Sequence, residues 1–151
     1  RATGEVMSRA GIGDDVDRTL RVLMYHKVND LWPNPVTVPT AVFAEQMSLL
    51  RALGYTVVSL DAVRDHYVDG APLPSAAVLI TFDDGWRDTM TNAWPVLRRL
   101  DLPAAVFLPV GFIGTRRLFT REAFTHLVLK ARDVASDPVK GPLVRQALAA
   151  Q

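Results

Sequence analysis

The chain has 151 residues, of which 49% are hydrophobic and 22% are charged, and its formal net charge is +1. This composition suits one folded domain of ordinary size, excludes a largely disordered chain, and gives no general attraction to nucleic acid or to a membrane surface. The sequence has no cysteine, which excludes disulfides and thiolate metal sites, and no uncharged run approaches the ~20 residues of a membrane-spanning helix.

The first forty residues predict one short strand between irregular segments. Residues 1–18 mix Gly, Asp, Arg and Ser without periodicity, which is typical of a linker or a disordered end. An apolar strand is expected at residues 20–25, and His26 stands at its end. Residues 29–39 contain three prolines, so we expect a loop there.

Two helices separated by a short strand are expected next. Thr40 is the expected cap of the first helix, whose apolar residues recur at helical spacing until Gly54 ends it. A strand is expected at residues 55–58, and Ser59 is expected to cap the second helix. The apolar residues of that second helix fall on one side: Leu60, Val63 and Tyr67.

An almost wholly apolar run at residues 76–82 is typical of a buried strand in a parallel sheet. Asp83 and Asp84 follow where that strand should end, and Gly85 lets the backbone turn. The carboxyl ends of parallel strands are where α/β folds usually place their chemistry. Two adjacent carboxylates repel each other unless a cation or a shared proton relieves them. The pair therefore predicts a metal site with an adjacent general base, and a turn without catalytic role is the alternative.

The rest of the chain continues the alternation of helices and strands. A loop or irregular helical turn at residues 85–91 precedes a helix at 93–100 and a strand at 104–108. A loop follows, and then a helix that Thr120 is expected to cap, with Phe124, Leu127, Val128 and Ala131 facing inward. A short last helix is expected at residues 143–150. This order predicts a parallel sheet with right-handed crossovers, and four strands are too few to close a barrel.

An ordered series of motifs resembles the polysaccharide deacetylases, the NodB-homology proteins of carbohydrate esterase family 4. The resemblance runs from about residue 20 to residue 117 and corresponds to the N-terminal half of that family's domain. Its most specific part is Thr-Phe-Asp-Asp-Gly at residues 81–85. The other matching segments lie at residues 23–28, 43–47, 53–55, 58–60, 73–74, 78–80 and 103–107.

The resemblance implies an α/β fold made of parallel (β/α) units of a distorted (β/α) barrel, which is incomplete in this chain. Residues 19–151 would then be the N-terminal part of a deacetylase domain. The implied activity is a metal-dependent hydrolase that removes N-acetyl groups from an amino-sugar polysaccharide. The resemblance makes Asp83 the general base and Asp84 a ligand of a divalent, zinc-like ion, for which zinc, cobalt, nickel and manganese are candidates.

The sequence departs from the family pattern in its histidines. Members of the family usually complete the metal site with a His-x-x-x-His pair, whereas His26, His66 and His126 stand far apart here. We therefore expect the second and third metal ligands to be missing, and the chain to be a truncated and inactive fragment. The alternative is a non-catalytic glycan-binding or degenerate deacetylase-like domain.

Three further residues are candidates for binding substrate or lining the site: His26, Trp86 and Arg87. His26 is expected at the same end of the sheet as Asp83, where it either lines the site or serves as a structural histidine. Trp86 either stacks on a sugar ring or packs at the barrel mouth. We also expect Asp88 to cap a helical turn, and Trp94 to lie in the core.

The resemblance implies an N-acetylated polysaccharide or oligosaccharide as the ligand. It also implies a place in the cell envelope or outside the cytoplasm, although no signal peptide is visible in the sequence. We expect no nucleic acid partner and no obligate protein partner. Since an incomplete barrel exposes strand edges, we expect the isolated chain to aggregate.

Overall fold

The computed structural model describes residues 19–31, 35–138 and 141–142. These residues fall into two compact units, the first ending at Pro109 and the second beginning at Val110. The linker predicted at residues 1–18 and the helix predicted at 143–150 lie outside the described residues.

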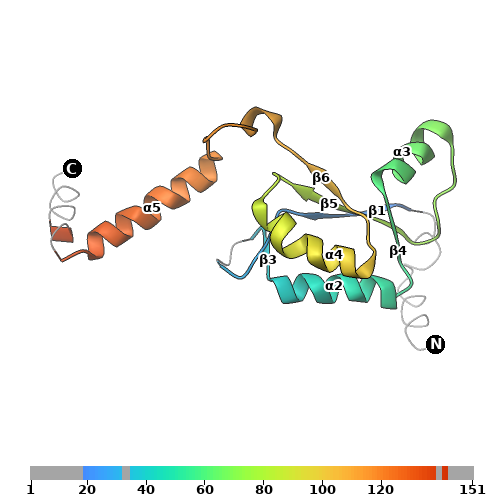
Figure 1. Ribbon diagram of the computed structural model, residues 1–151, viewed down its shortest axis with the longest axis horizontal. Helices are drawn as coiled ribbons and strands as arrows, with labels where there is room; N and C mark the ends of the chain where they lie inside the picture. Colours follow the sequence, from blue (N-terminus) through green and yellow to red (C-terminus); the bar gives the residue numbers. More distant parts are fainter. Residues whose placement is uncertain (1–18, 32–34, 139–140, 143–151) are drawn as a thin grey trace. The chain divides into compact units, whose positions relative to one another are not determined.

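A parallel sheet of four strands forms the centre of the first unit (Figure 1). The strands are β1 (Arg21–Tyr25), β4 (Thr56–Val58), β5 (Ala77–Asp83) and β6 (Ala105–Phe107). In β5, Val78 pairs with β1 and with β4, and Thr81 pairs with β1 and with β6. β1 therefore lies along one edge of β5, while β4 and β6 share the opposite edge. The predicted parallel α/β arrangement is confirmed.

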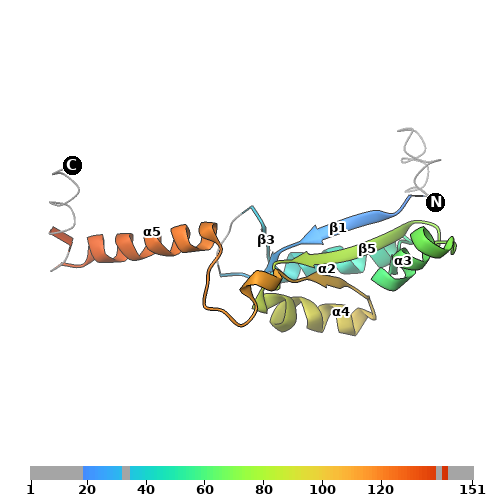
Figure 2. The same cartoon turned by 90° about the horizontal axis from the view of Figure 1, so that it is seen from above.

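The hydrophobic core lies between this sheet and two helices, α2 (Thr40–Ala52) and α4 (Trp94–Leu100) (Figures 1 and 2). Its centre is an aromatic cluster of Tyr25, Phe43 and Phe82, whose ring centroids are 5.1 to 5.8 Å apart. Such pairs contribute roughly 0.5–1.5 kcal/mol each beyond their buried area. Because Tyr25 is the last residue of β1 and Phe82 directly precedes Asp83 in β5, this cluster fixes the end of the sheet where the paired acids lie.

The helix ends differ in part from the prediction. Ser59 caps α3 (Leu60–Asp69) as expected, because its hydroxyl accepts a 3.2 Å hydrogen bond from the amide of Ala62. Thr40 does not cap α2: it is the first helical residue, and Pro39 occupies the cap position without a side-chain bond. Gly54 follows α2 with a positive φ of 79°, as a residue that ends a helix should.

The expected inward side of α3 is not buried. None of the residues of this helix is buried, and Tyr67 is 71% exposed. His66 was not predicted to have a structural contact, yet its Nδ1 lies 2.6 Å from the carbonyl oxygen of Ala71. The apolar spacing of α3 thus indicated a face, but that face is at most half-buried: Val63 is half-buried, and Leu60 and Tyr67 are exposed.

The proline-rich loop contains a strand that was not predicted. β2 (Lys27–Val28) and β3 (Thr37–Val38) form a separate two-stranded parallel sheet. The amide of Lys27 donates to the carbonyl of Val36 over 3.1 Å, which extends this pairing. The prediction of a continuous loop at residues 29–39 is therefore wrong at Thr37–Val38, since a two-residue strand leaves no periodic signal in a sequence.

Residues 87–100 form one helical run that contains a π-helical segment, η1 (Thr89–Ala93), before α4. Pro95 has no amide hydrogen, and its ring would clash with the carbonyl of the preceding turn in a regular α-helix. A wider π turn accommodates this proline. The prediction of an irregular helical turn before α4 is confirmed, whereas Trp94, predicted to be core, is 48% exposed.

The second unit consists of a short 3-10 helix, η2 (Val110–Phe112), and α5 (Thr120–Ser136). Phe119 rather than Thr120 holds the cap position of α5, and it makes no side-chain cap bond. The side of α5 that we expected to face inward is exposed within this unit: Phe124, Leu127, Val128 and Ala131. No helix among the described residues is long and apolar enough to cross a membrane.

Candidate active site

The two acids lie where the sequence predicts them, at the carboxyl end of the central strand. Asp83 is the last residue of β5, and Asp84 and Gly85 turn the chain with φ angles of 71° and 64°. A side chain at Gly85 would be strained by this φ, and its Cβ would come within 2.4 Å of Leu108 Cδ2. The φ angle and the nearby Leu108 side chain therefore both favour glycine at this position.

Strand register places Asp83 on the sheet face opposite the core. Side chains alternate along a strand, so Asp83 lies on the other face from Phe82. Val22, Met24 and Phe107 pair with Leu79, Thr81 and Asp83 and share that face. Val22, Met24 and Phe107 are 55%, 63% and 49% exposed. On the same face, Leu79 and Thr81 of the central strand are buried. Asp83, itself half-buried, thus stands at the end of a largely apolar sheet face that is exposed on its flanking strands.

His26 reaches the same end of the sheet as Asp83. Tyr25 pairs with Phe82, so the next residue on each strand, His26 and Asp83, are backbone neighbours at the point where the strands end. The side chain of His26 is half-buried. The structure therefore places these two predicted residues at the same carboxyl end of the sheet, because neighbouring parallel strands end together.

Asp84 is held by the next aromatic residue along the chain. The indole nitrogen Nε1 of Trp86 donates a 3.2 Å hydrogen bond to Oδ2 of Asp84. Nζ of Lys27, from β2, lies 3.8 Å from the centroid of the Trp86 ring. Lys27 was not among the residues predicted for the site, because it stands 59 positions before Trp86 and belongs to an unpredicted strand.

Trp86 and Arg87, which follow the acids in the sequence, line a cavity of about 490 Å³. Arg87 is exposed in the cavity wall, while Trp86 is half-buried. None of His26, Asp83 and Asp84 is among the described residues that line it. The other lining residues come from the end of β2 and from the helical run after the motif: Asn29, Asp30, Leu31, Asp88, Thr91 and Asn92.

Two hydrogen bonds fasten the end of β2 to the helical run. The amide group of Asn29 donates a short bond to Oδ2 of Asp88. Asn92 Nδ2 donates to the carbonyl of Val28 over 2.7 Å. Asp88 holds the cap position before η1 but makes no side-chain cap bond there, which corrects the prediction. Local sequence carries no sign of these contacts, since the partners are 59 and 64 residues apart.

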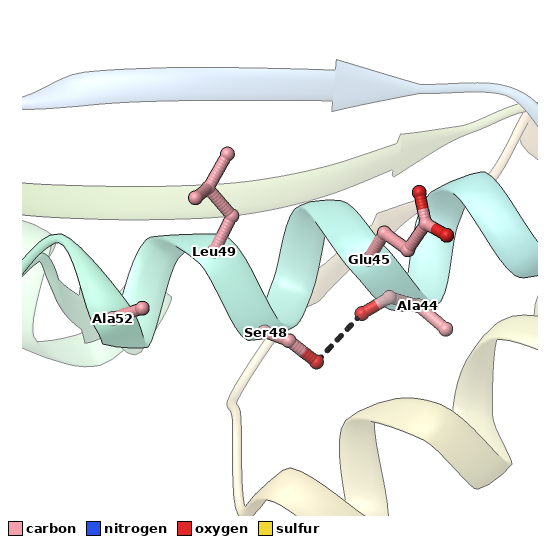
Figure 3. A pocket seen from close by; sticks show the side chains of 5 residues that line it. All are labelled: Ala44, Glu45, Ser48, Leu49 and Ala52. Carbon is pink, nitrogen blue, oxygen red and sulfur yellow. Dashed lines mark hydrogen bonds between the residues drawn. The ribbon is translucent and has the colours of Figure 1, made fainter.

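A second cavity, of about 420 Å³, runs along α2 (Figure 3). Of its five lining residues only Glu45 is ionisable, and the hydroxyl of Ser48 already donates to the carbonyl of Ala44 over 2.9 Å. This cavity offers no neighbouring acid and base for catalysis. The paired acids at the end of β5 remain the candidate site.

The described residues fit a divalent ion only in part. Carboxylate oxygens such as those of Asp84 are suitable ligands for a divalent cation. Within the part of the chain that the structure describes, however, no group of three His, Cys, Asp or Glu residues is placed to hold a metal. The described site is thus a carboxylate pair rather than a complete metal centre.

A parallel sheet with paired acids at the end of its central strand defines an α/β protein with an enzyme-like site. Residues 70–132 match the sequence model of one family, described as polysaccharide deacetylase. The family resemblance seen in the motifs is confirmed over this part of the chain, and it places the chain among relatives of the polysaccharide deacetylases.

Individual relatives agree with this family. The poly-beta-1,6-N-acetyl-D-glucosamine N-deacetylase of Escherichia coli strain K12 is 37% identical over 91 residues, which are 59% of this chain and 13% of that protein. The structure of IcaB from Ammonifex degensii matches with a TM-score of 0.60 and 33% identity, covering 67% of this chain and 42% of that chain.

A third relative is the polysaccharide deacetylase BC0361 from Bacillus cereus, with a TM-score of 0.55 and 26% identity, covering 76% of this chain and 37% of that chain. The structural neighbours confirm the predicted fold class, parallel (β/α) units of the deacetylase barrel. This chain spans well under half the length of each of these relatives.

Proposed function

We propose that this chain belongs to an enzyme that removes N-acetyl groups from an amino-sugar polysaccharide. One observation carries the proposal: two adjacent acids end the central strand, inside the segment that matches the polysaccharide deacetylases. We further propose that residues 19–151 form the N-terminal part of such a domain, as the motif series implies.

The two acids have different roles in this proposal. Hydrolysis of the amide breaks the carbon–nitrogen bond, so that a water oxygen ends on the acetate and a proton ends on the amine. Asp83, as general base, takes the proton from the attacking water. Asp84 is one ligand of a divalent, zinc-like ion, with zinc, cobalt, nickel and manganese as candidates. When bound, such an ion acts as a Lewis acid toward the carbonyl and the water.

The metal site needs ligands beyond Asp84. One carboxylate holds a divalent ion weakly, and the described residues offer no group of three ligands. The proposal therefore requires further ligands from outside the described residues. By the same argument, we propose that this chain alone binds the ion poorly and has little activity.

The substrate is proposed from the relatives and from the cavity. The Escherichia coli relative is named for poly-beta-1,6-N-acetyl-D-glucosamine, so an N-acetylated polysaccharide or oligosaccharide is the proposed substrate here. His26, at the strand edge, and Trp86 and Arg87, in the cavity wall, are proposed to line the path of this polymer. A substrate of this kind would place the enzyme in the cell envelope or outside the cytoplasm.

Acetate release tests the proposal against its alternative, a glycan-binding domain without activity. The whole natural protein that carries this sequence is mixed with poly-β-1,6-N-acetylglucosamine oligomers and excess zinc or cobalt, and acetate is measured alongside oligomer binding. Metal-stimulated acetate release supports the hydrolase. Oligomer binding with no acetate release under either ion supports the non-catalytic domain and contradicts the proposal.

A further inference from the structure

Trp86 stands between a cation and the carboxylate of Asp84. One face of its ring is covered by Lys27 Nζ, 3.8 Å from the ring centroid. Its N–H group donates to Oδ2 of Asp84 over 3.2 Å. The three side chains thus form a short series in the order ammonium, indole and carboxylate.

The carboxylate at the end of this series sits on unusual backbone. Asp84 has a φ of 71°, in the left-handed region that residues other than glycine seldom adopt. Such conformations persist where the surroundings hold them, and they gather at functional sites. The indole bond is one such restraint, because it ties the side chain of Asp84 to a residue two positions further along.

The cation at the other end is also held in place. The backbone of Lys27 pairs with β3, and its amide donates to Val36 over 3.1 Å. The next residue, Val28, accepts from Asn92 over 2.7 Å. β2 is therefore bonded to the helical run at residues 87–100, and the backbone that carries the Lys27 side chain is fixed.

This arrangement has an electrostatic consequence. A cation over an aromatic face attracts the ring's electron density. Donors and acceptors connected in series polarise one another, so the indole N–H becomes a stronger donor toward the carboxylate. The bond occupies Oδ2 of Asp84 and turns the carboxylate into one orientation about its side chain.

We propose that Trp86 is a positioning residue that orients the Asp84 carboxylate, and that Lys27 strengthens its hold from the opposite side of the ring. The importance of this orientation for catalysis rests on the proposed function, whereas the contact itself does not. Because Lys27 covers one face of the Trp86 ring, a sugar could stack only on the other face. The proposal therefore gives Trp86 a role other than sugar stacking.

The indole signal of Trp86 in ¹H–¹⁵N correlation spectra tests the contact directly. Trp86→Phe identifies the signal by its disappearance, and Trp94→Phe, at an exposed tryptophan on α4, is the matched control. Asp84→Gly removes the acceptor while allowing a φ of 71° without strain. We expect this variant to move the Trp86 indole proton toward the shift of a solvent-exposed indole.

Lys27 is tested by the same signal. Lys27→Met removes the charge but keeps the chain length, and we expect the indole proton to move in the same direction by a smaller amount. Lys27→Arg keeps a cation over the ring, and we expect it to retain the wild-type shift. An indole signal that is unchanged in a folded Asp84→Gly protein overturns the proposal, since simple packing of Trp86 would give that result.

Kinetics on poly-β-1,6-N-acetylglucosamine oligomers extend the test to catalysis. Trp86→Phe keeps an aromatic ring but loses the indole N–H group. We expect kcat to fall about 10- to 100-fold, because that is the usual effect of losing a hydrogen bond to a charged group, while KM stays nearly unchanged. Unchanged kcat overturns the positioning role. If the wild type releases no acetate, the proposed function fails, while the indole shifts still decide whether Trp86 holds Asp84.

Discussion

At the scale of single residues, the site depends on backbone φ angles that residues other than glycine seldom adopt. Asp84 adopts a positive φ directly after a buried strand, and Gly85 continues the turn where no other residue fits easily. The sequence predicted both acids and the glycine, because Asp-Asp-Gly after an apolar run carries that information locally. It did not predict Lys27 over Trp86, since that contact depends on how two distant segments fold together.

Tyr25 provides a prediction about pH at this scale. Burial raises the pKa of the Tyr25 phenol above its ordinary value of about 10. Below pH ~10 the folded and unfolded states both keep the proton, and stability is unaffected. Above it the unfolded chain loses the proton first, so the free energy of unfolding falls as pH rises toward the folded pKa.

Tyr25→Phe isolates this effect. The variant loses the 2.9 Å hydrogen bond to Gln46, so we expect it to be less stable than the wild type at pH 8. It also lacks the titrating phenol, so its stability should fall less between pH 8 and pH 11. Urea unfolding at both pH values measures the two changes, and equal losses in both proteins would contradict the burial argument.

At the scale of elements, the sequence located most helices and strands but not all of their ends. Residues such as Ser59 and Gly54 act through their immediate neighbours, so local chemistry was enough to place them. β2 and β3 are only two residues each. The π-helical segment η1 accommodates Pro95 inside a helical run that begins earlier in the sequence than predicted. Short or strained elements are set by tertiary contacts, and a sequence pattern does not contain these.

The two predicted helix caps give a matched pair of variants. Ser59→Ala removes the side-chain bond to the amide of Ala62, and we expect a loss of ~1 kcal/mol in the free energy of unfolding. Thr40→Ala removes a side chain that makes no cap bond, so we expect a change of a few tenths of a kcal/mol at most. Denaturant unfolding measures both, and equal losses would contradict the assignment of Pro39 as the α2 cap.

At the scale of the whole molecule, the described sheet matches one part of longer solved chains. The structural relatives are deacetylases with (β/α) units, and this chain covers 36% and 42% of two of them. The sheet face that carries Val22, Met24 and Asp83 is partly exposed. The composition predicted enough apolar residues for a core. It did not predict that exposed apolar residues would also lie on the sheet face opposite that core.

This exposed face supports the predicted self-association of the isolated chain. Contiguous apolar surface favours association in water. Val22→Thr with Met24→Thr keeps good strand formers at both positions while adding polar atoms. We expect the double variant to remain monomeric at higher protein concentrations than the wild type in sedimentation velocity experiments. Identical association of the two proteins would show that another surface is responsible.

The central claim is that Asp83 acts as the base that activates water for amide hydrolysis. It is tested most directly by the rate of acetate release from poly-β-1,6-N-acetylglucosamine by Asp83→Asn in the whole natural protein. Asp65→Asn is the control, because Asp65 lies on α3 and pairs with Arg64 at 2.8 Å. We predict a loss of about 100- to 10,000-fold for Asp83→Asn and little change for the control. A folded Asp83→Asn protein with wild-type activity would contradict the account.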